Sequence, residues 1–135
     1  MIDIQVKQTV TTDEKTEVFE FNTTGECMKK RHTYIIYEEV LEDIKTQVRV
    51  KVEDGQIRIH RKGALSLDFL FVPYETTQNM YHMANQKTVM DITTNQLHIE
   101  QNEQGGHIYI QYHINNNGAN LGSYSYEITY KERME

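Results

Sequence analysis

The sequence predicts an all-β protein built as one closed, antiparallel, up-and-down barrel of about eight strands. Apolar and polar residues alternate along most of the chain, turn residues separate the alternating segments, and the links are short. Alternation with period two is typical of strands that bury one face. Strands joined by short links become neighbours, and a meander that closes on itself has no free edges. A two-sheet sandwich is the alternative, because it produces the same periodicity.

Five alternating segments lie in the first half of the chain. Asp54 and Gly55 separate two of them, and these residue types tolerate the positive φ of a two-residue hairpin turn. Residues 38–45 place three apolar side chains at helical spacing, but an isolated helix of about two turns is marginal. We therefore expect a strand end and a turn there. The segments are residues 2–7, 18–21, 47–52, 57–60 and 65–71.

The second half of the chain repeats this pattern. Asn115–Gly118 is the strongest turn signal in the sequence, and Asn85–Gln86 and Gly105–Gly106 predict two further turns. The alternating segments are residues 90–92, 97–99, 107–114 and 124–130.

The composition is that of a soluble globular protein, with 38% apolar and 25% charged residues, and we expect a single domain over residues 1–135. A net charge of -6 repels phosphate backbones, so we expect no nucleic-acid partner. No stretch approaches the roughly 20 apolar residues of a membrane span, so we expect no membrane partner. The first residues lack the features of a signal peptide, and Cys27 is the single cysteine, which together predict a cytoplasmic protein.

Residues suited to metal binding or catalysis occur in no recognisable pattern. His60, His98, His107 and His113 oppose the apolar faces of their strands, so we expect them to face solvent. The chain contains no Gly-x-Ser-x-Gly motif and no phosphate-binding loop. We therefore expect no metal, no other cofactor and no enzymatic activity.

Arg61 is the most informative residue, because it has the parity of the apolar residues of its strand and so points into the predicted barrel. A buried guanidinium is costly unless it is paired. One explanation is a carboxylate of the same barrel, for which Glu38 and Glu39 are the nearest candidates. The other is the anionic head group of a ligand. A β-bulge at Gly63 would instead turn Arg61 outward.

Tyrosines form the second group of candidate site residues, because a bulky ring with a polar tip suits a cavity wall or a barrel mouth. A small barrel is either just filled by side chains or holds one small ligand. The aromatic volume favours a filled or nearly filled interior, since four phenylalanines are expected to add to it. With Arg61, the candidate ligand-binding residues are Tyr34, Tyr112, Tyr124 and Tyr126; the phenylalanines are Phe19, Phe21, Phe69 and Phe71.

Over residues 15–131, several segments, taken in order and with their spacing, resemble a known family. This is the YwiB-like family of small bacterial β-barrel proteins, a domain of unknown function. The resemblance implies an eight-stranded, calycin-like (lipocalin-like) barrel and no particular activity. The segments are Glu17–Gly25, Tyr34–Glu39, Thr46–Gly55, Arg61–Ala64, Ile108–Tyr112 and Tyr126–Tyr130.

Two functions fit these observations. The first is a module that binds a small apolar or anionic ligand inside the barrel, which Arg61 favours. The second is a structural or protein-interaction module with a side-chain-filled barrel and no ligand, for instance a homodimer. Residues 79–90, which contain three methionines, are either a docking surface of such a module or ordinary core.

Overall fold

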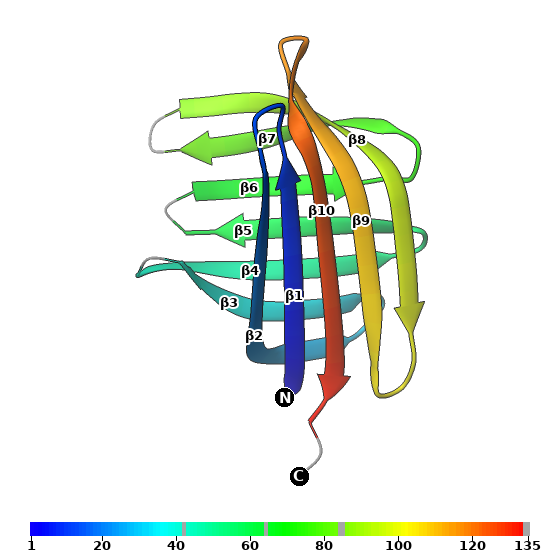
Figure 1. Cartoon of the computed structure of the whole chain (residues 1–135). Helices are drawn as coiled ribbons and strands as arrows, with labels where there is room; N and C mark the ends of the chain where they lie inside the picture. Colours follow the sequence, from blue (N-terminus) through cyan, green and yellow to red (C-terminus); the bar gives the residue numbers. More distant parts are fainter. Residues whose placement is uncertain (42, 64, 84–85, 134–135) are drawn as a thin grey trace.

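The computed structural model describes residues 1–41, 43–63, 65–83 and 86–133, which form one closed antiparallel barrel (Figure 1). The predicted all-β closed barrel is confirmed, but it has ten strands rather than about eight, and two more strands make a wider barrel. The strands are β1 (Ile2–Thr11), β2 (Thr16–Lys29), β3 (Thr33–Leu41), β4 (Ile44–Glu53), β5 (Gln56–Lys62), β6 (Leu65–Phe71), β7 (Thr76–Met83), β8 (Gln86–Gln101), β9 (Gly105–Asn116) and β10 (Ala119–Glu132).

The strand order is the simple meander that short links predict. Each strand pairs with the next along the chain, and β1 pairs with β10 to close the barrel. The closing ladder runs from Ile2 opposite Glu132 to Thr11 opposite Ser123. Among the described residues, no helix is both long and apolar enough to span a bilayer.

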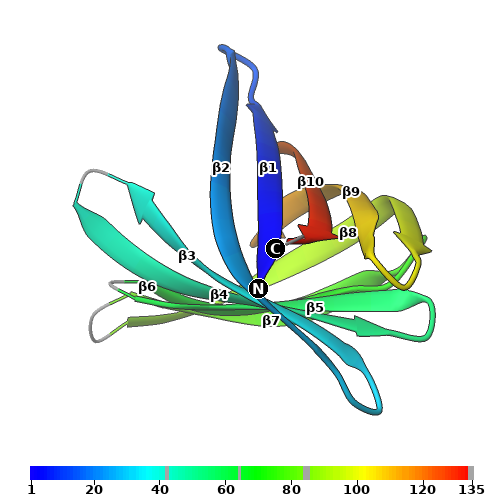
Figure 2. The ribbon, with the colours of Figure 1, turned by 90° about the horizontal axis from the view of Figure 1, so that it is seen from below.

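The barrel is flattened into two layers whose strands cross (Figures 1 and 2). Strands β3 to β7 run across the direction of β1, β9 and β10 in Figure 1. The long strand β8 belongs to both layers, since it pairs first with β7 and then with β9. Its register shifts between Thr94 and Gln96, as expected of a β-bulge that bends a strand. The fold thus combines the crossed layers of an orthogonal sandwich with the closure of a barrel.

Strands β2 and β3 diverge toward one end of the barrel. They pair over Gly25–Lys29, whereas Thr16–Gly25 of β2 pairs with β1, and Figure 2 shows the two strands separating. Strands β6 and β7 also separate, and there Asn79 links them: its Oδ1 accepts a hydrogen bond from the Leu70 amide at 2.8 Å. The two divergences lie at opposite ends of the crossing strands, since the C-terminal end of β3 lies on the side of the N-terminal end of β6.

Most of the predicted turns are confirmed. Gly55, with φ 72°, lies between β4 and β5, and Asn117 (φ 52°) and Gly118 (φ 81°) join β9 to β10. The latter pair has the positive dihedrals of a type I′ hairpin. The strand end and turn predicted within residues 38–45 are also found, with β3 ending at 41 and β4 beginning at 44. Of the turn predicted at residues 85 and 86, residue 85 lies outside the described residues.

The turn predicted at Gly105–Gly106 is wrong, because both glycines belong to β9. The turn precedes them, and Asn102 Oδ1 accepts hydrogen bonds there from the amides of Gln104 and Gly105, at 2.8 and 2.9 Å. A Cβ on Gly106 would lie 2.5 Å from the backbone carbonyl oxygen of Glu100 on β8 and 2.7 Å from the Tyr130 hydroxyl. Glycine is therefore required by the close approach of a neighbouring backbone carbonyl and a tyrosine, and not by a turn.

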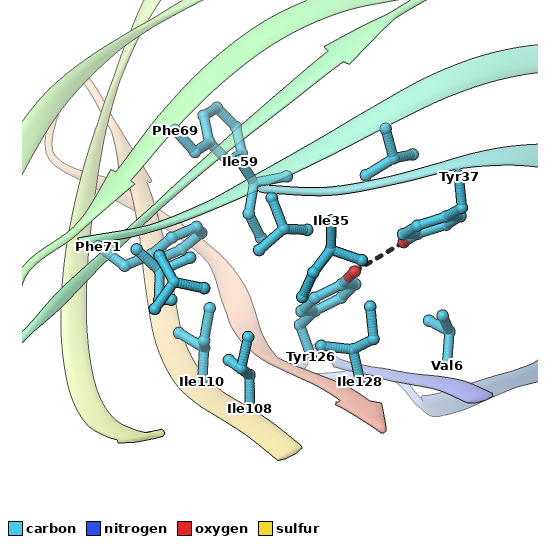
Figure 3. Close-up of a cluster of buried hydrophobic side chains, with 14 of the residues drawn as sticks. Val6, Ile35, Tyr37, Ile59, Phe69, Phe71, Ile108, Ile110, Tyr126 and Ile128 are labelled. Atoms are coloured by element: carbon cyan, nitrogen blue, oxygen red, sulfur yellow. Dashed lines mark hydrogen bonds between the residues drawn. The ribbon is translucent and has the colours of Figure 1, made fainter. Parts of the chain in front are cut away.

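Aliphatic side chains from both layers fill one end of the barrel, which we call the closed half. Figure 3 shows Ile128 between Val6 on one side and Ile108 and Ile110 on the other, with Ile35 above them. The four isoleucines are fully buried. The chain ends lie at this end of the barrel in Figure 1. The inward positions predicted by alternation are thus confirmed for this part of the core.

Candidate functional site

An open cavity of about 340 Å³ occupies the other end of the interior, which we call the open half. Its size lies within the roughly 300–1,000 Å³ of small-molecule sites. The prediction of a filled or nearly filled interior is therefore corrected for this half. The cavity is lined by the apolar side chains of Val10, Ile59, Leu67, Met90, Ile114 and Leu121, by the rings of Phe69, Phe71, Tyr81, Tyr112, Tyr124 and Tyr126, and by Gln8 and Arg61.

Three aromatic rings in the lining of the cavity pack against one another. The rings of Tyr112 and Tyr124, on the adjacent strands β9 and β10, are nearly parallel, with centroids 5.3 Å apart. Phe71 lies against this pair, 4.7 Å from the Tyr112 ring. Phe71 lies on β6 and Tyr112 on β9, so the third ring joins the stacked pair from the opposite layer, and the three rings form one apolar surface.

Arg61 points inward, as its parity predicts. The register of β5 with both neighbouring strands shows no shift at this residue, so the bulge alternative is not realised. Its Nη1 donates to Glu39 Oε2 at 2.9 Å, and the Glu39 side chain is only 9% exposed. Glu38, the other candidate, is exposed. The structural explanation, an internal carboxylate, therefore accounts for the buried charge.

Gln8 joins this ion pair, since its Nε2 donates to Glu39 Oε2 at 3.4 Å. Gln8 lies on β1 and Glu39 on β3, so the contact spans the region in which β2 and β3 diverge. A polar cluster therefore connects the strands where the backbone ladder has ended.

A pair of buried tyrosines lies at the boundary between the packed core and the cavity, since Tyr126 belongs to both. The hydroxyls of Tyr37 and Tyr126 are 2.7 Å apart and hydrogen-bonded (Figure 3). Burial raises the pKa of Tyr37 to about 12, although the nearby Arg61 opposes this shift. Burial likewise raises the pKa of Tyr126 well above its ordinary value. Both phenols are therefore neutral at physiological pH.

Arg61 keeps its charge in this environment. Burial by itself would lower the pKa of the guanidinium, but the acidic groups of Tyr37, Glu39 and Tyr126 around it raise that pKa. Burial also raises the pKa of Tyr112 to about 12. The cavity thus presents neutral rings and one cation whose charge its neighbour Glu39 balances.

The structure brings together four of the five predicted ligand-binding residues: Arg61, Tyr112, Tyr124 and Tyr126 all line the cavity. The prediction that the fifth residue, Tyr34, lies in the interior is wrong, because Tyr34 faces outward while Ile35 and Tyr37 face inward. Apolar residues at all four positions 34–37 hide the alternation there. The register shows which of these side chains face inward, because Ile35 pairs with the inward Val50.

Tyr34 belongs instead to an outer groove of about 330 Å³ over β3 to β6. The Nζ of Lys51 lies 5.9 Å from the centroid of its ring. Lys51 also pairs with Glu53 at 2.9 Å, and Arg58 pairs with Asp68 at 3.2 Å. Two cations that line this groove, Lys51 and Arg58, are thus paired with neighbouring carboxylates.

Sequence reasoning missed Tyr37, Tyr81 and Gln8. Gln8 could have been found, because it continues the inward parity of Ile2, Ile4 and Val6. Tyr81 pairs with the inward Leu67, and only the register reveals this.

The expected burial of the four phenylalanines needs correction for Phe19, whereas Phe21 faces inward, opposite the buried Val6. Phe19 is 43% exposed at the diverging part of β2. Phe21 is partly buried, with its ring 6.2 Å from that of Tyr37. By contrast, Phe69 and Phe71 are buried as expected.

Three of the four histidines expected to face solvent lie on the outer surface of the barrel. His60 and His98 are exposed, and His107 pairs on the exterior with Glu127 at 2.6 Å, so the predicted outward positions are confirmed for these three. In the described ranges no group of three or more potential metal ligands is found. Burial raises the pKa of the Cys27 thiol, which disfavours the reactive thiolate.

Comparison with known proteins identifies relatives but no activity. The family model of a domain of unknown function (DUF1934) matches residues 4–128. The uncharacterized β-barrel protein YwiB of Bacillus subtilis (strain 168) is 28% identical over 131 residues, which cover 96% of this chain and 92% of that protein. The crystal structure of the ywiB protein from Bacillus subtilis matches with a TM-score of 0.86 at 28% identity and covers 98% of this chain and 92% of that one. The resemblance inferred from the sequence is confirmed.

Proposed function

The chain belongs to the DUF1934 family, a domain of unknown function, and we propose that it is a binding protein whose open half holds a small, mainly apolar ligand. The observation that carries this proposal is the cavity of about 340 Å³, lined by stacked aromatic rings with Arg61 among them. Small-molecule sites are typically concave and mostly apolar, with few polar groups that orient the ligand. No catalytic group is assigned, so we propose binding and not catalysis.

The size of the cavity limits the ligand. A cavity of about 150 Å³ lined by aliphatic and aromatic side chains holds one benzene molecule. The open half has roughly twice that volume, which suits a ligand of about ten to fifteen heavy atoms. The single cysteine supports a cytoplasmic location for this binding, which belongs to the proposal.

Extraction of the purified protein with organic solvent, followed by mass spectrometry, tests this function. We expect a co-purifying molecule of that size, or saturable binding of the neutral fluorescent probe 1-aminonaphthalene by the emptied protein. Leu121→Trp, at a cavity-lining position 41% exposed, should abolish binding. Val89→Trp, on the outer face of β8 and 49% exposed, is the matched control and should leave it intact. Absence of both an extracted molecule and probe binding would contradict the proposal.

The alternative function, an interaction module, rests on a smaller observation. Met80 and Val89 face each other across β7 and β8 on the exterior, 40% and 49% exposed. Two side chains fall far short of the roughly 800 Å² per partner in a stable interface. We therefore rank this function second. Light scattering at high protein concentration tests it, and a homodimer that Met80→Lys dissociates would favour it.

A further inference from the structure

We propose, on the premise of the binding function above, that the ligand is uncharged and carries a hydrogen-bond acceptor at one end, such as an amide, ester, ketone or alcohol, and is not a carboxylate. The reasoning starts from the ion pair at the cavity. Arg61 is inward-facing and lines the cavity, yet its charge is already balanced by Glu39 at 2.9 Å. The pair as a whole is therefore neutral.

A carboxylate ligand would make this site net negative. It would contact a guanidinium whose Nη1 is held by Glu39, and so would place a second carboxylate close to that of Glu39. Glu39 is only 7% exposed, and Gln8 is the other described residue that donates to it. Charges repel more strongly in a poorly solvated site than in water, because solvent screens them less. An anion is therefore disfavoured.

A neutral acceptor avoids this repulsion. A guanidinium has five N–H donors, so the bond to Glu39 leaves others for a ligand oxygen. The wall around Arg61 is formed by Ile59, Leu67 and the ring of Tyr112, which suit an alkyl or aromatic body. The charge-balanced pair thus works as a polar anchor that discriminates against acids.

Decanamide and decanoate test this inference, because both have twelve heavy atoms and they differ in charge at pH 8. We expect the wild-type protein to bind decanamide at least tenfold more tightly than decanoate, measured by NMR titration below the concentration at which either ligand aggregates. Glu39→Gln removes the balancing charge and should reverse the preference. Glu38→Gln, the same change on the exposed neighbour, should leave the wild-type preference unaltered.

The outcomes separate this inference from the proposed function. If wild-type protein binds neither compound and no other apolar molecule, the binding function itself fails. If decanoate binds as tightly as decanamide or more tightly, the function stands and the inference is overturned. The inference also fails if Glu39→Gln, shown by circular dichroism to be folded, keeps the wild-type preference, or if Glu38→Gln reverses it as well.

Discussion

The closed and open halves of the barrel share strands β1, β9 and β10 but fill their interiors differently. In the closed half, Ile108 and Ile128 are paired across β9 and β10 and are fully buried. In the open half, Tyr112 and Tyr124 pair across the same two strands, and both line a cavity. The comparison indicates that packing is tightest at one end, while the other end keeps the space in which we propose that a ligand binds. The predictions below test this division, beginning with the polar boundary between the halves.

Removing the charge of Arg61 should have the largest effect. Arg61→Met leaves Glu39 buried without its partner, which costs about 3–5 kcal/mol for a buried pair. The double variant Arg61→Met with Glu39→Leu should recover most of that loss, because no uncompensated charge remains. Urea unfolding followed by circular dichroism measures both. A single variant that is as stable as wild type would show that the pair is effectively solvated.

Truncation should affect the two halves unequally. Ile128→Ala in the closed half should cost about 2–5 kcal/mol, because the fully buried side chain leaves a cavity. Leu67→Ala in the open half should cost only about 1 kcal/mol, since this side chain already borders empty space. Equal losses in urea unfolding would refute the division into a packed half and a hollow half.

The tyrosine pair at the boundary should contribute through its hydrogen bond. Tyr37→Phe leaves the buried Tyr126 hydroxyl without its partner, at a cost of about 1–3 kcal/mol. The double variant Tyr37→Phe with Tyr126→Phe should cost less than the sum of the two single variants, because no orphaned hydroxyl remains. Strict additivity in a double-mutant cycle would mean that the two hydroxyls do not interact.

The smallest effect we predict is a loss of stability in alkali. The folded pKa of Tyr37 is about 12, above the ordinary value of about 10 in the unfolded chain. The contribution of the Tyr37 phenol to the free energy of unfolding is therefore complete below about pH 10 and is lost as the pH rises from 10 through 12. At about pH 11 the loss is about 1 kcal/mol, and Tyr37→Phe should show a correspondingly smaller decline. An ordinary phenol pKa in the ultraviolet titration of Tyr37 would contradict this.

The fold was largely predictable from the sequence, because alternation and hairpin turns are local signals. Arg61 illustrates this, since the parity of its own strand placed it inside and limited its partner to two carboxylates. Tyr34 illustrates the limit, because four consecutive apolar residues leave the alternation ambiguous until the register with β4 is known.

The cavity itself could not be predicted from the sequence. Its volume depends on how the rings of Tyr112, Tyr124 and Phe71 pack against one another, which is a property of the closed barrel and not of any segment. Aromatic residues in the sequence show how much volume must be placed but not where it lies. The same composition would fit a filled interior.

The most direct test of the account is an NMR titration of wild-type protein with decanamide, followed through assigned backbone amides. The account predicts saturable shifts confined to the strands around the open half, at Arg61, Leu67 and Tyr124 and their neighbours, and unchanged signals at Ile108 and Ile128 in the closed half. No saturable shift, or shifts confined to the outer groove beside Tyr34, would contradict the claim that this barrel binds a ligand in its open half.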